Sequence, residues 1–271
     1  MDVITIRTPV IVPTVGHSQD LLPTLTQALD RAAVTPLRDG DVLCITSKVV
    51  AVAQGRVVRL SDVEPSPQAR TMRRLRYSKD FDAHPELAEL VLREADALFV
   101  GEGGHVYITL KGWVWIANAG LDLSNAPAGT AILWPAAPWA WAAEFRTRLK
   151  ALYGVSQLGI LLTDSRLTPL RRGVTGVAIA YAGFEGIQSE VGKPDLFGRP
   201  LKVTEKAVAD DLASVAILIG GESAESTPFT LVRGAPVIFT DREIDPREAF
   251  IKPQDDLYAG MYNTAFKSLV P

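Results

Sequence analysis

The sequence has little of several things that mark particular protein classes. Cys44 is the only cysteine among 271 residues, which excludes an intrachain disulfide and a cysteine-based zinc site. It lies in the apolar run 42–45, where a buried, unreactive thiol is expected. The three histidines stand at positions 17, 84 and 105, and this spacing matches no metal site, so we assign no metal to them.

An excess of charge and a long apolar run are also missing. The formal net charge is only −3, which gives no reason to expect nucleic acid or an acidic membrane surface as a partner. No apolar run approaches the roughly 20 residues that span a bilayer. The first residues alternate apolar and polar from Val3 to Arg7, which predicts a strand rather than a signal peptide. We therefore expect a cytoplasmic protein.

The usual nucleotide-binding motifs do not occur. There is no G-x-x-x-x-G-K-[ST] sequence, and the glycine cluster at 101–104 lacks the G-x-G-x-x-G spacing. That cluster is more simply a hairpin turn between two strands. No Ser-His-Asp or Cys-His arrangement can be argued from the sequence either.

Short strand-like runs alternate with amphipathic segments, which predicts a mixed α/β (α+β) protein. In the last helix, Val208, Leu212, Val215 and Ile219 form one apolar stripe, and Thr204 is the expected N-cap. Strands are expected at Val3–Arg7, Val10–Val12, Asp41–Thr46, Arg56–Leu60, Ala97–Val100, Val106–Leu110, Trp113–Ala117, Ala131–Trp134, Leu158–Thr163, Val174–Ala182, Leu201–Val203 and Phe229–Val232. Helices are expected at Gln19–Ala33, Gln68–Leu75, Pro85–Ala95, Trp139–Tyr153 and Glu205–Ile219.

Residues 161–176, LLTDSRLTPLRRGVTG, form the most informative pattern. The apolar run 158–163 predicts a buried strand, and Asp164 and Ser165 follow where that strand is expected to end. Side chains at this end of a strand face the crevice where open α/β sheets bind ligands. A carboxylate beside a hydroxyl suits Mg²⁺ or Mn²⁺, which bind together with substrate phosphates. The arginines that would attract such phosphates are Arg166, Arg171 and Arg172.

Two further segments place oxygen-bearing side chains after apolar runs. The first is a glycine-containing loop within 113–125, and the second, 217–222, puts Glu222 beyond a helix end. All three segments can also be read as solvated turns, because Asp, Asn and Gly favour turns and helix ends. If their acidic residues converge, they could hold two metal ions that clamp phosphate oxygens. The residues concerned are Asp122, Ser124 and Asn125 in the first loop, and Gly220, Gly221 and Glu222 in the second.

The chain resembles the coenzyme F420-0:L-glutamate ligase family over nearly its whole length to about Gly234. The resemblance is strongest to a branch ascribed to folate metabolism, in which TDS-x-x-TPLR-x-GVTG, a GKPDLFGR-like segment, an LWP strand and a DDLY tail (here 255–258) are characteristic. The matching stretches follow the family's order. They are GDVLCITSKVVAVAQGRVV (40–58), NAGLDLSN (118–125), LLTDSRLTPLRRGVTGVAIAYAGF (161–184), GKPDLFGRPLKVTEKAVADDLA (192–213), GGE (220–222) and LVRG (231–234).

The resemblance implies a homodimer of mixed α/β subunits with two intertwined lobes. On this basis we expect a catalytic unit over 1–234, with lobes of about 1–155 and 156–234. Residues 235–271 would form a C-terminal docking tail. The apolar anchors that the tail offers for dimer formation are Leu257, Tyr258 and Phe266.

The resemblance also implies the site residues. Two divalent ions, Mg²⁺ or Mn²⁺, would be held by Asp122, Asp164, Ser165 and Glu222. A nucleotide, GTP or ATP, would contact Val12, Pro13, Thr14, Val15, Ser47, Lys48, Asn125 and the loop that begins at Gly220 and Gly221. The monovalent ion K⁺ is a further candidate.

The chain departs from the family at three places. A lysine that touches the nucleotide in some members is Val52 here, so phosphate contact would shift to Lys48 or Arg171. A GRPWR-like turn is replaced by residues 167–170, and a DPD-like acidic turn by residues 136–139. The last two changes alter the substrate side and put the deazaflavin substrate in doubt. The tryptophans near the second turn, Trp139 and Trp141, either stack on a flat heterocycle or serve only in packing.

We therefore expect a γ-glutamyl ligase that uses ATP or GTP to join L-glutamate to a carboxylate-bearing heterocyclic molecule of folate or F420 type. The acceptor carboxylate would first be phosphorylated and then attacked by the glutamate amine. Asp164 and Arg171 are the expected catalytic residues, and Arg172 and Arg199 are further candidates for phosphate or carboxylate contact; surface ion pairs are the alternative role. The alternatives for the whole chain are a nucleotide-binding regulatory paralog that does not ligate, or a metal-dependent phosphohydrolase.

Overall fold

The computed structural model describes residues 1–72, 85–99, 106–252, 255–258 and 260. Its largest sheet has the strand order β1-β12-β2-β8-β9, in which β2 and β8 are parallel and all other neighbours are antiparallel. The mixed α/β class expected from the sequence is confirmed. The strands of this sheet are β1 (Asp2–Ile6), β2 (Asp41–Thr46), β8 (Leu158–Leu167), β9 (Val174–Ala182) and β12 (Phe229–Arg233).

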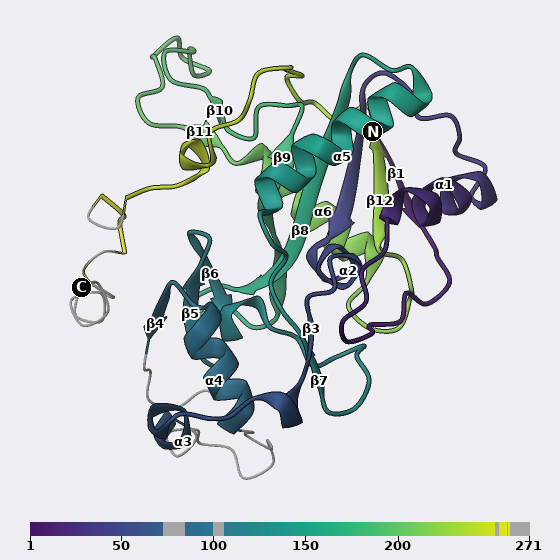
Figure 1. Ribbon diagram of the computed structural model, residues 1–271. Coiled ribbons are helices and arrows are strands. Elements are labelled where there is room, and N and C mark those ends of the chain that lie inside the picture. The colour runs from purple at the N-terminus through teal and green to yellow at the C-terminus, as the bar shows by residue number, and fades with distance from the viewer. Residues whose placement is uncertain (73–84, 100–105, 253–254, 259, 261–271) are drawn as a thin grey trace.

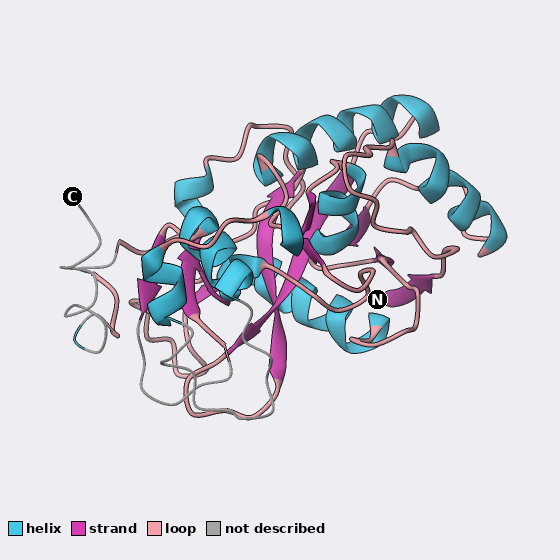
Figure 2. Cartoon of the chain, turned by 60° about the horizontal axis from the view of Figure 1, so that its bottom comes forward, coloured by secondary structure: helices cyan, strands magenta, loops and turns pink. Residues whose placement is uncertain are grey.

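Helices cover both faces of this sheet, which is why its central strands β2 and β8 carry the apolar runs 42–45 and 158–162. In β2, Leu43 and Ile45 pack with α1 (Leu21–Arg31), α2 (Ser47–Ala53) and α5 (Pro138–Tyr153) on one face. Val42 and Cys44 point to the other face and pack with α6 (Val208–Gly220). Figure 2 shows the long strands running between these helices.

A smaller part of the chain lies below this sheet in Figure 1. Its three-stranded antiparallel sheet packs beside two short helices, and a two-stranded ribbon connects it with the large sheet. The three strands are β4 (Ala97–Phe99), β5 (Ile108–Lys111) and β6 (Val114–Ala117), and the helices are α3 (Pro67–Met72) and α4 (Pro85–Glu94). The ribbon is made of β3 (Val57–Arg59) and β7 (Thr130–Ile132), and single 3₁₀ turns lie at Leu60–Asp62 and Asn118–Gly120.

After β9 the chain forms an exposed arm, in which β10 (Gln188–Ser189) pairs with β11 (Glu205–Lys206). The chain after β12 returns across the molecule to a 3₁₀ turn, η4 (Pro246–Ala249). The Arg242 guanidinium holds this return segment by donating to Glu185 Oε1 at 2.8 Å and to Glu248 Oε1 at 2.7 Å. The large sheet takes strands from both sides of the expected division near residue 155, so that division stays a proposal.

One expectation about the main motif is wrong. Strand β8 does not end at Thr163 but continues to Leu167, so Asp164 and Ser165 lie inside a strand. The cause is β9, which keeps pairing with this stretch, Asp164 opposite Val177 and Ser165 opposite Gly176. A register shift between Leu162 and Thr163 separates the buried part of β8 from this polar extension.

The start of the last helix was also predicted wrongly. Helix α6 begins at Val208 after Ala207, so Thr204 is not its N-cap, because Glu205 and Lys206 pair with β10 instead. Ile219, expected in the apolar stripe, is 50 % exposed. No strand forms at 10–12 or at 201–203, and α2 was not expected from the sequence. The expected hairpin turn at 101–104 and the last residues of the helix expected at 68–75 lie outside the described residues.

The expectations about the single cysteine and about membrane-spanning segments can be compared with the structure. Cys44 is 1 % exposed, which confirms the expected burial, and burial raises the pKa of its thiol to about 12, the direction that favours an unreactive side chain. Over the ranges that the structure describes, no helix is both long and apolar enough to span a membrane.

Candidate functional site

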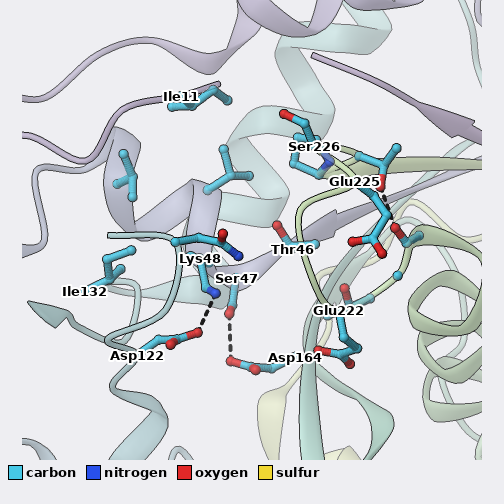
Figure 3. A pocket seen from close by; sticks show the side chains of 18 of the residues that line it. Ile11, Thr46, Ser47, Lys48, Asp122, Ile132, Asp164, Glu222, Glu225 and Ser226 are labelled. Atoms are coloured by element: carbon cyan, nitrogen blue, oxygen red, sulfur yellow. Dashed lines mark hydrogen bonds and ion pairs between the residues drawn. The ribbon is translucent and has the colours of Figure 1, made fainter. Parts of the chain in front are cut away.

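The largest group of candidate residues meets where the parallel pairing of β2 with β8 ends. Thr46 of β2 is paired with Thr163 of β8, and the residues that follow them line one cavity of about 310 Å³. Such an edge is where α/β sheets place their ligands. We call it the acidic cavity (Figure 3). Its polar lining includes Ser47, Lys48, Asp122, Asn125, Asp164, Ser165 and Glu222.

Asp164 is held in place by two hydrogen bonds. The Ser47 hydroxyl, at the start of α2, donates to Asp164 Oδ2 at 2.6 Å, and the Ser165 amide donates to Oδ1 at 2.7 Å. Burial raises the pKa of the Asp164 carboxyl to about 6, although these hydrogen bonds favour its charged form. The neighbouring Asp122 carboxylate raises this pKa further, and Lys48 lowers it. Asp164 is therefore a desolvated acid whose charged form a nearby cation would stabilise.

The Lys48 ammonium is a cation that lies among the carboxylates. It forms an ion pair with Asp122 and a hydrogen bond of 3.1 Å to Ser124 Oγ. Asp122 is positioned from the smaller part of the molecule, because its backbone exchanges two hydrogen bonds of 2.9 Å with Ile132, the last residue of β7. Its Oδ1 also accepts from the Ser124 amide at 2.6 Å. Lys48 thus joins the edge of the large sheet to the loop from the smaller part.

Glu222 enters the cavity from a glycine turn that ends α6. Gly221 has φ +84°, and a Cβ there would come within 2.4 Å of the Glu225 carboxyl carbon, so a side chain at this position would strain the backbone and displace the Glu225 carboxylate. Burial raises the pKa of Glu222; Lys48 lowers it, and the carboxylates of Asp122 and Glu225 raise it. Three carboxylates from three distant segments, Asp122, Asp164 and Glu222, therefore lie along one side of the cavity (Figure 3).

Most of the residues expected to contact a nucleotide line the same cavity, namely Pro13, Ser47, Lys48, Asn125, Gly220 and Gly221. Asn125 Nδ2 donates to the Ser223 carbonyl at 2.9 Å and so ties the two loops together. Val12, Thr14 and Val15 are exposed residues of the neighbouring loop and are not part of the lining. Val52 lines the apolar end with Ile11 and Ile132.

The arginine candidates lie away from the cavity. Arg171 and Arg172 are exposed in the turn between β8 and β9, and neither lines the cavity. Arg199 belongs to the exposed arm, where its guanidinium bonds Asp195 at 3.1 Å. Arg166, the next residue after Ser165, donates to Asp210 of α6 at 3.1 Å. Among the residues that the structure describes, Lys48 is therefore the cation nearest the three carboxylates.

The donor set can be compared with what a divalent metal requires. Carboxylate and hydroxyl oxygens are the ligands that Mg²⁺ and Mn²⁺ prefer, and the raised pKa values of Asp164 and Glu222 reflect negative charge that burial disfavours. In residue type, the lining fits such an ion. Among the described residues, however, no three His, Cys, Asp or Glu side chains are close enough to hold one, and Lys48 pairs with Asp122 instead.

The sequence reasoning missed part of the lining. The segment 223–228 forms one wall, and Glu225 within it accepts from the Ser223 amide at 2.8 Å and turns its carboxylate toward Glu222. In the sequence, only the position of Glu225 three residues after Glu222 in the same loop could have indicated that it lines the cavity. Thr8 and Ile11 also line the cavity, although the segment around them forms no strand.

Comparisons with known proteins agree on one family. Residues 6–234 match the family model described as F420-0:gamma-glutamyl ligase. Proteins named coenzyme F420:L-glutamate ligase are similar over most of the chain. That of Methanopyrus kandleri is 41 % identical over 198 residues, 73 % of this chain and 76 % of the relative. That of Methanothermobacter thermautotrophicus is 35 % identical over 225 residues, 83 % and 86 % of the two chains, and that of Archaeoglobus fulgidus 34 % over 220 residues, 80 % and 86 %.

Proposed function

The chain belongs to the F420-0:γ-glutamyl ligase family, and we propose that it joins L-glutamate to a carboxylate-bearing heterocyclic acceptor at the expense of GTP or ATP. The observation that carries this proposal is the convergence of Asp122, Asp164 and Glu222 on one cavity beside Lys48. A carboxylate acceptor and a nucleoside triphosphate are both anionic, so a site that brings them together must neutralise charge.

We assign Asp122, Asp164, Ser165 and Glu222 to hold one or two divalent ions, Mg²⁺ or Mn²⁺, when nucleotide is bound. Such ions offset the charge of phosphate oxygens. Because Lys48 now pairs with Asp122, its ammonium would have to turn toward a phosphate when the metal arrives. A need for K⁺ belongs to the same proposal and is tested by omitting it.

The protein's own residues then act by positioning. Ser47 and the Ser165 amide fix the Asp164 carboxylate, and the Asn125–Ser223 contact holds the two loops that would enclose the phosphates. Lys48 supplies a mobile positive charge for the transferred phosphoryl group. An acceptor carboxylate oxygen attacks the γ-phosphorus and GDP or ADP leaves, which gives an acyl phosphate. The glutamate amine then attacks the acyl carbon, phosphate leaves, and the amine nitrogen loses a proton as the amide forms.

The acceptor is of the F420 or the folate type. The folate alternative rests on the turns at 136–139 and 167–170, which differ from those of the coenzyme ligases.

We further propose that the protein works in the cytoplasm, where nucleoside triphosphates and glutamate are abundant.

We also propose that the active form is a homodimer. The arm between β10 and β11 exposes Leu196, Phe197 and Val203 at 99, 83 and 86 %, and the tail exposes Leu257 at 98 %; Phe266 lies outside the described residues. Exposed apolar side chains grouped in this way are typical of an interface. Light scattering at micromolar concentration should give twice the chain mass, and a monomer would contradict the proposal.

The ligase proposal is tested with Asp122→Asn, Asp164→Asn and Glu222→Gln, assayed for glutamate-dependent phosphate release. Each should lose most of the activity, whereas Asp62→Asn, an exposed aspartate of the first 3₁₀ turn, should not. Phosphate release that does not depend on glutamate would indicate a phosphohydrolase instead. Nucleotide binding without any turnover would indicate a regulatory paralog.

A further inference from the structure

A second cavity lies between the β5–β6 hairpin, the start of α5 and the returning tail. Its volume is about 350 Å³, and three of the chain's five tryptophans line it. We call it the tryptophan cavity. Its aromatic and proline lining is Trp113, Trp134, Pro135, Pro138, Trp139 and Phe250. Large flat side chains grouped around an open space suit a flat ligand better than a branched aliphatic one.

Trp113 occupies a position that backbone sterics disfavour. It is the second residue of the two-residue turn between β5 and β6, where Gly112 and Trp113 have φ of +55° and +65°. Such a turn favours glycine at this position, and a bulky residue with positive φ is an outlier. The side chain is nevertheless 50 % exposed and lies against the Phe250 ring, 6.0 Å between centroids. Backbone strain that places a half-exposed aromatic ring over a cavity is typical of a ligand site.

The other aromatic rings are held firmly. Trp139 packs edge-on against Tyr181 at 4.9 Å between centroids. Trp134 is 4 % exposed and lies over Gly120, where a Cβ would come within 2.2 Å of its ring. Two walls of the cavity are therefore fixed before any ligand arrives, and a fixed wall reduces the entropy cost of binding.

One edge of the cavity is charged and carries groups of both signs. Arg56 donates to Glu94 Oε1 at 2.8 Å, and the Lys111 ammonium lies 3.7 Å from both Glu94 and Asp96. Asp96 Oδ2 accepts from the Gly112 amide at 2.6 Å, which fixes this carboxylate beside the strained turn. An edge with fixed carboxylates and cations matches a ring that carries both N–H donors and carbonyl acceptors.

The two cavities share a wall. Leu133 lines the acidic cavity and Trp134, the next residue, lines the tryptophan cavity. Gly120, whose Cα lies against Trp134, lines the acidic cavity as well. We propose that the tryptophan cavity binds the planar nitrogen heterocycle of the acceptor, while the acceptor's carboxylate reaches the acidic cavity. This inference rests on the proposed ligase function.

The test measures binding of ring probes that carry no glutamate, pteroic acid and 5-deazariboflavin, by calorimetry. Trp113→Gly suits the turn and removes the ring, and Trp139→Leu removes a second wall. Trp141→Leu is the matched control, because Trp141 lies on the same helix but stacks on Phe145, outside this cavity. We expect both cavity variants to weaken binding of at least one probe on the order of tenfold, the range of one aromatic stacking contact. The control should bind as the wild type does, and GTP affinity should not change.

Wild-type affinity in both cavity variants, or no binding of either probe to the wild type, would overturn the inference. A loss of GTP affinity in place of ring affinity would assign the cavity to the nucleotide and would equally overturn it. The ligase proposal is tested separately, by measuring glutamate-dependent turnover. If the wild type ligates and the cavity variants keep its KM for the acceptor, the inference fails and the function stands. If ring binding is lost as expected but no protein ligates, the function fails and the site stands.

Discussion

Replacing Asp164 by Asn should make the metal-free protein more stable and the enzyme inactive. The amide keeps the shape of the carboxylate, and its oxygen can still accept from the Ser165 amide while its nitrogen donates to the Ser47 hydroxyl. Folding therefore loses little from the exchange. What disappears is a buried negative charge.

The size of the gain follows from the pKa of Asp164, which burial raises to about 6. The ordinary value is near 4, and each pKa unit between the folded and unfolded states corresponds to about 1.4 kcal/mol. An acid with a raised pKa costs nothing below its unfolded value, where both states are protonated. The cost grows as the pH rises through 4 to 6 and is complete above 6. In EDTA at pH 7.5 the Asn variant should thus be more stable by about 1–3 kcal/mol, and this advantage should vanish at pH 4.

The assay is guanidinium unfolding at the two pH values, with and without Mn²⁺ and nucleotide. Metal and nucleotide should stabilise the wild type by binding its folded state, and the variant much less. Turnover of the variant should fall on the order of a thousandfold, equivalent to about 4 kcal/mol of lost transition-state stabilisation. A folded Asn variant with near-normal turnover would refute the role of Asp164. A variant that is less stable than the wild type in EDTA would refute the electrostatic reasoning.

Three further predictions concern the reactivity of the buried thiol and the stability of the fold. Cys44 should resist Ellman's reagent at pH 8 until the protein unfolds, because burial raises its pKa to about 12; rapid reaction of the native protein would contradict this. Asp41→Ala should cost about 3–5 kcal/mol in guanidinium unfolding, because it strips the partner, 3.0 Å away, from the largely buried Arg233; a cost below 1 kcal/mol would contradict this. Gly176→Ala should destabilise by about 1–3 kcal/mol, since its Cβ would lie 2.4 Å from the Ala213 backbone in α6; an unchanged unfolding midpoint would show that α6 can shift.

The parts of the fold that could be predicted are those in which local pattern and burial agree. Strands β2 and β9 have their predicted bounds, because the apolar runs 42–45 and 177–182 match strands with both faces covered. The start of α6 was missed because Glu205 and Lys206 pair with β10, in contacts between residues about 16 to 18 positions apart that no local pattern reveals. Helix α2 was missed because its 7 residues are too few to show a helical period, and its run of valines and alanines is equally typical of a strand.

The site was predictable in residue type but not in arrangement. Spacing alone gave Asp122, Asp164 and Glu222 as polar side chains after apolar runs, and the resemblance to a family joined them into one site. The Lys48–Asp122 ion pair could not be predicted from the sequence, because it depends on how the smaller part packs against the edge of β2. The exposed position of Arg171 could not be predicted either, since it follows from the extension of β8 beyond Asp164.

The central claim is amide formation with glutamate, and one measurement tests it most directly. The protein is incubated with Mn²⁺, isotopically labelled L-glutamate, GTP or ATP, and either a deazaflavin carboxylate of the F420-0 type or a folate monoglutamate. The products are analysed by mass spectrometry. We expect one acceptor to gain the mass of a glutamyl residue, with phosphate and amide formed in equal amounts and neither formed by Asp164→Asn. Phosphate release at the same rate with and without glutamate, and no labelled product from either acceptor, would contradict the account.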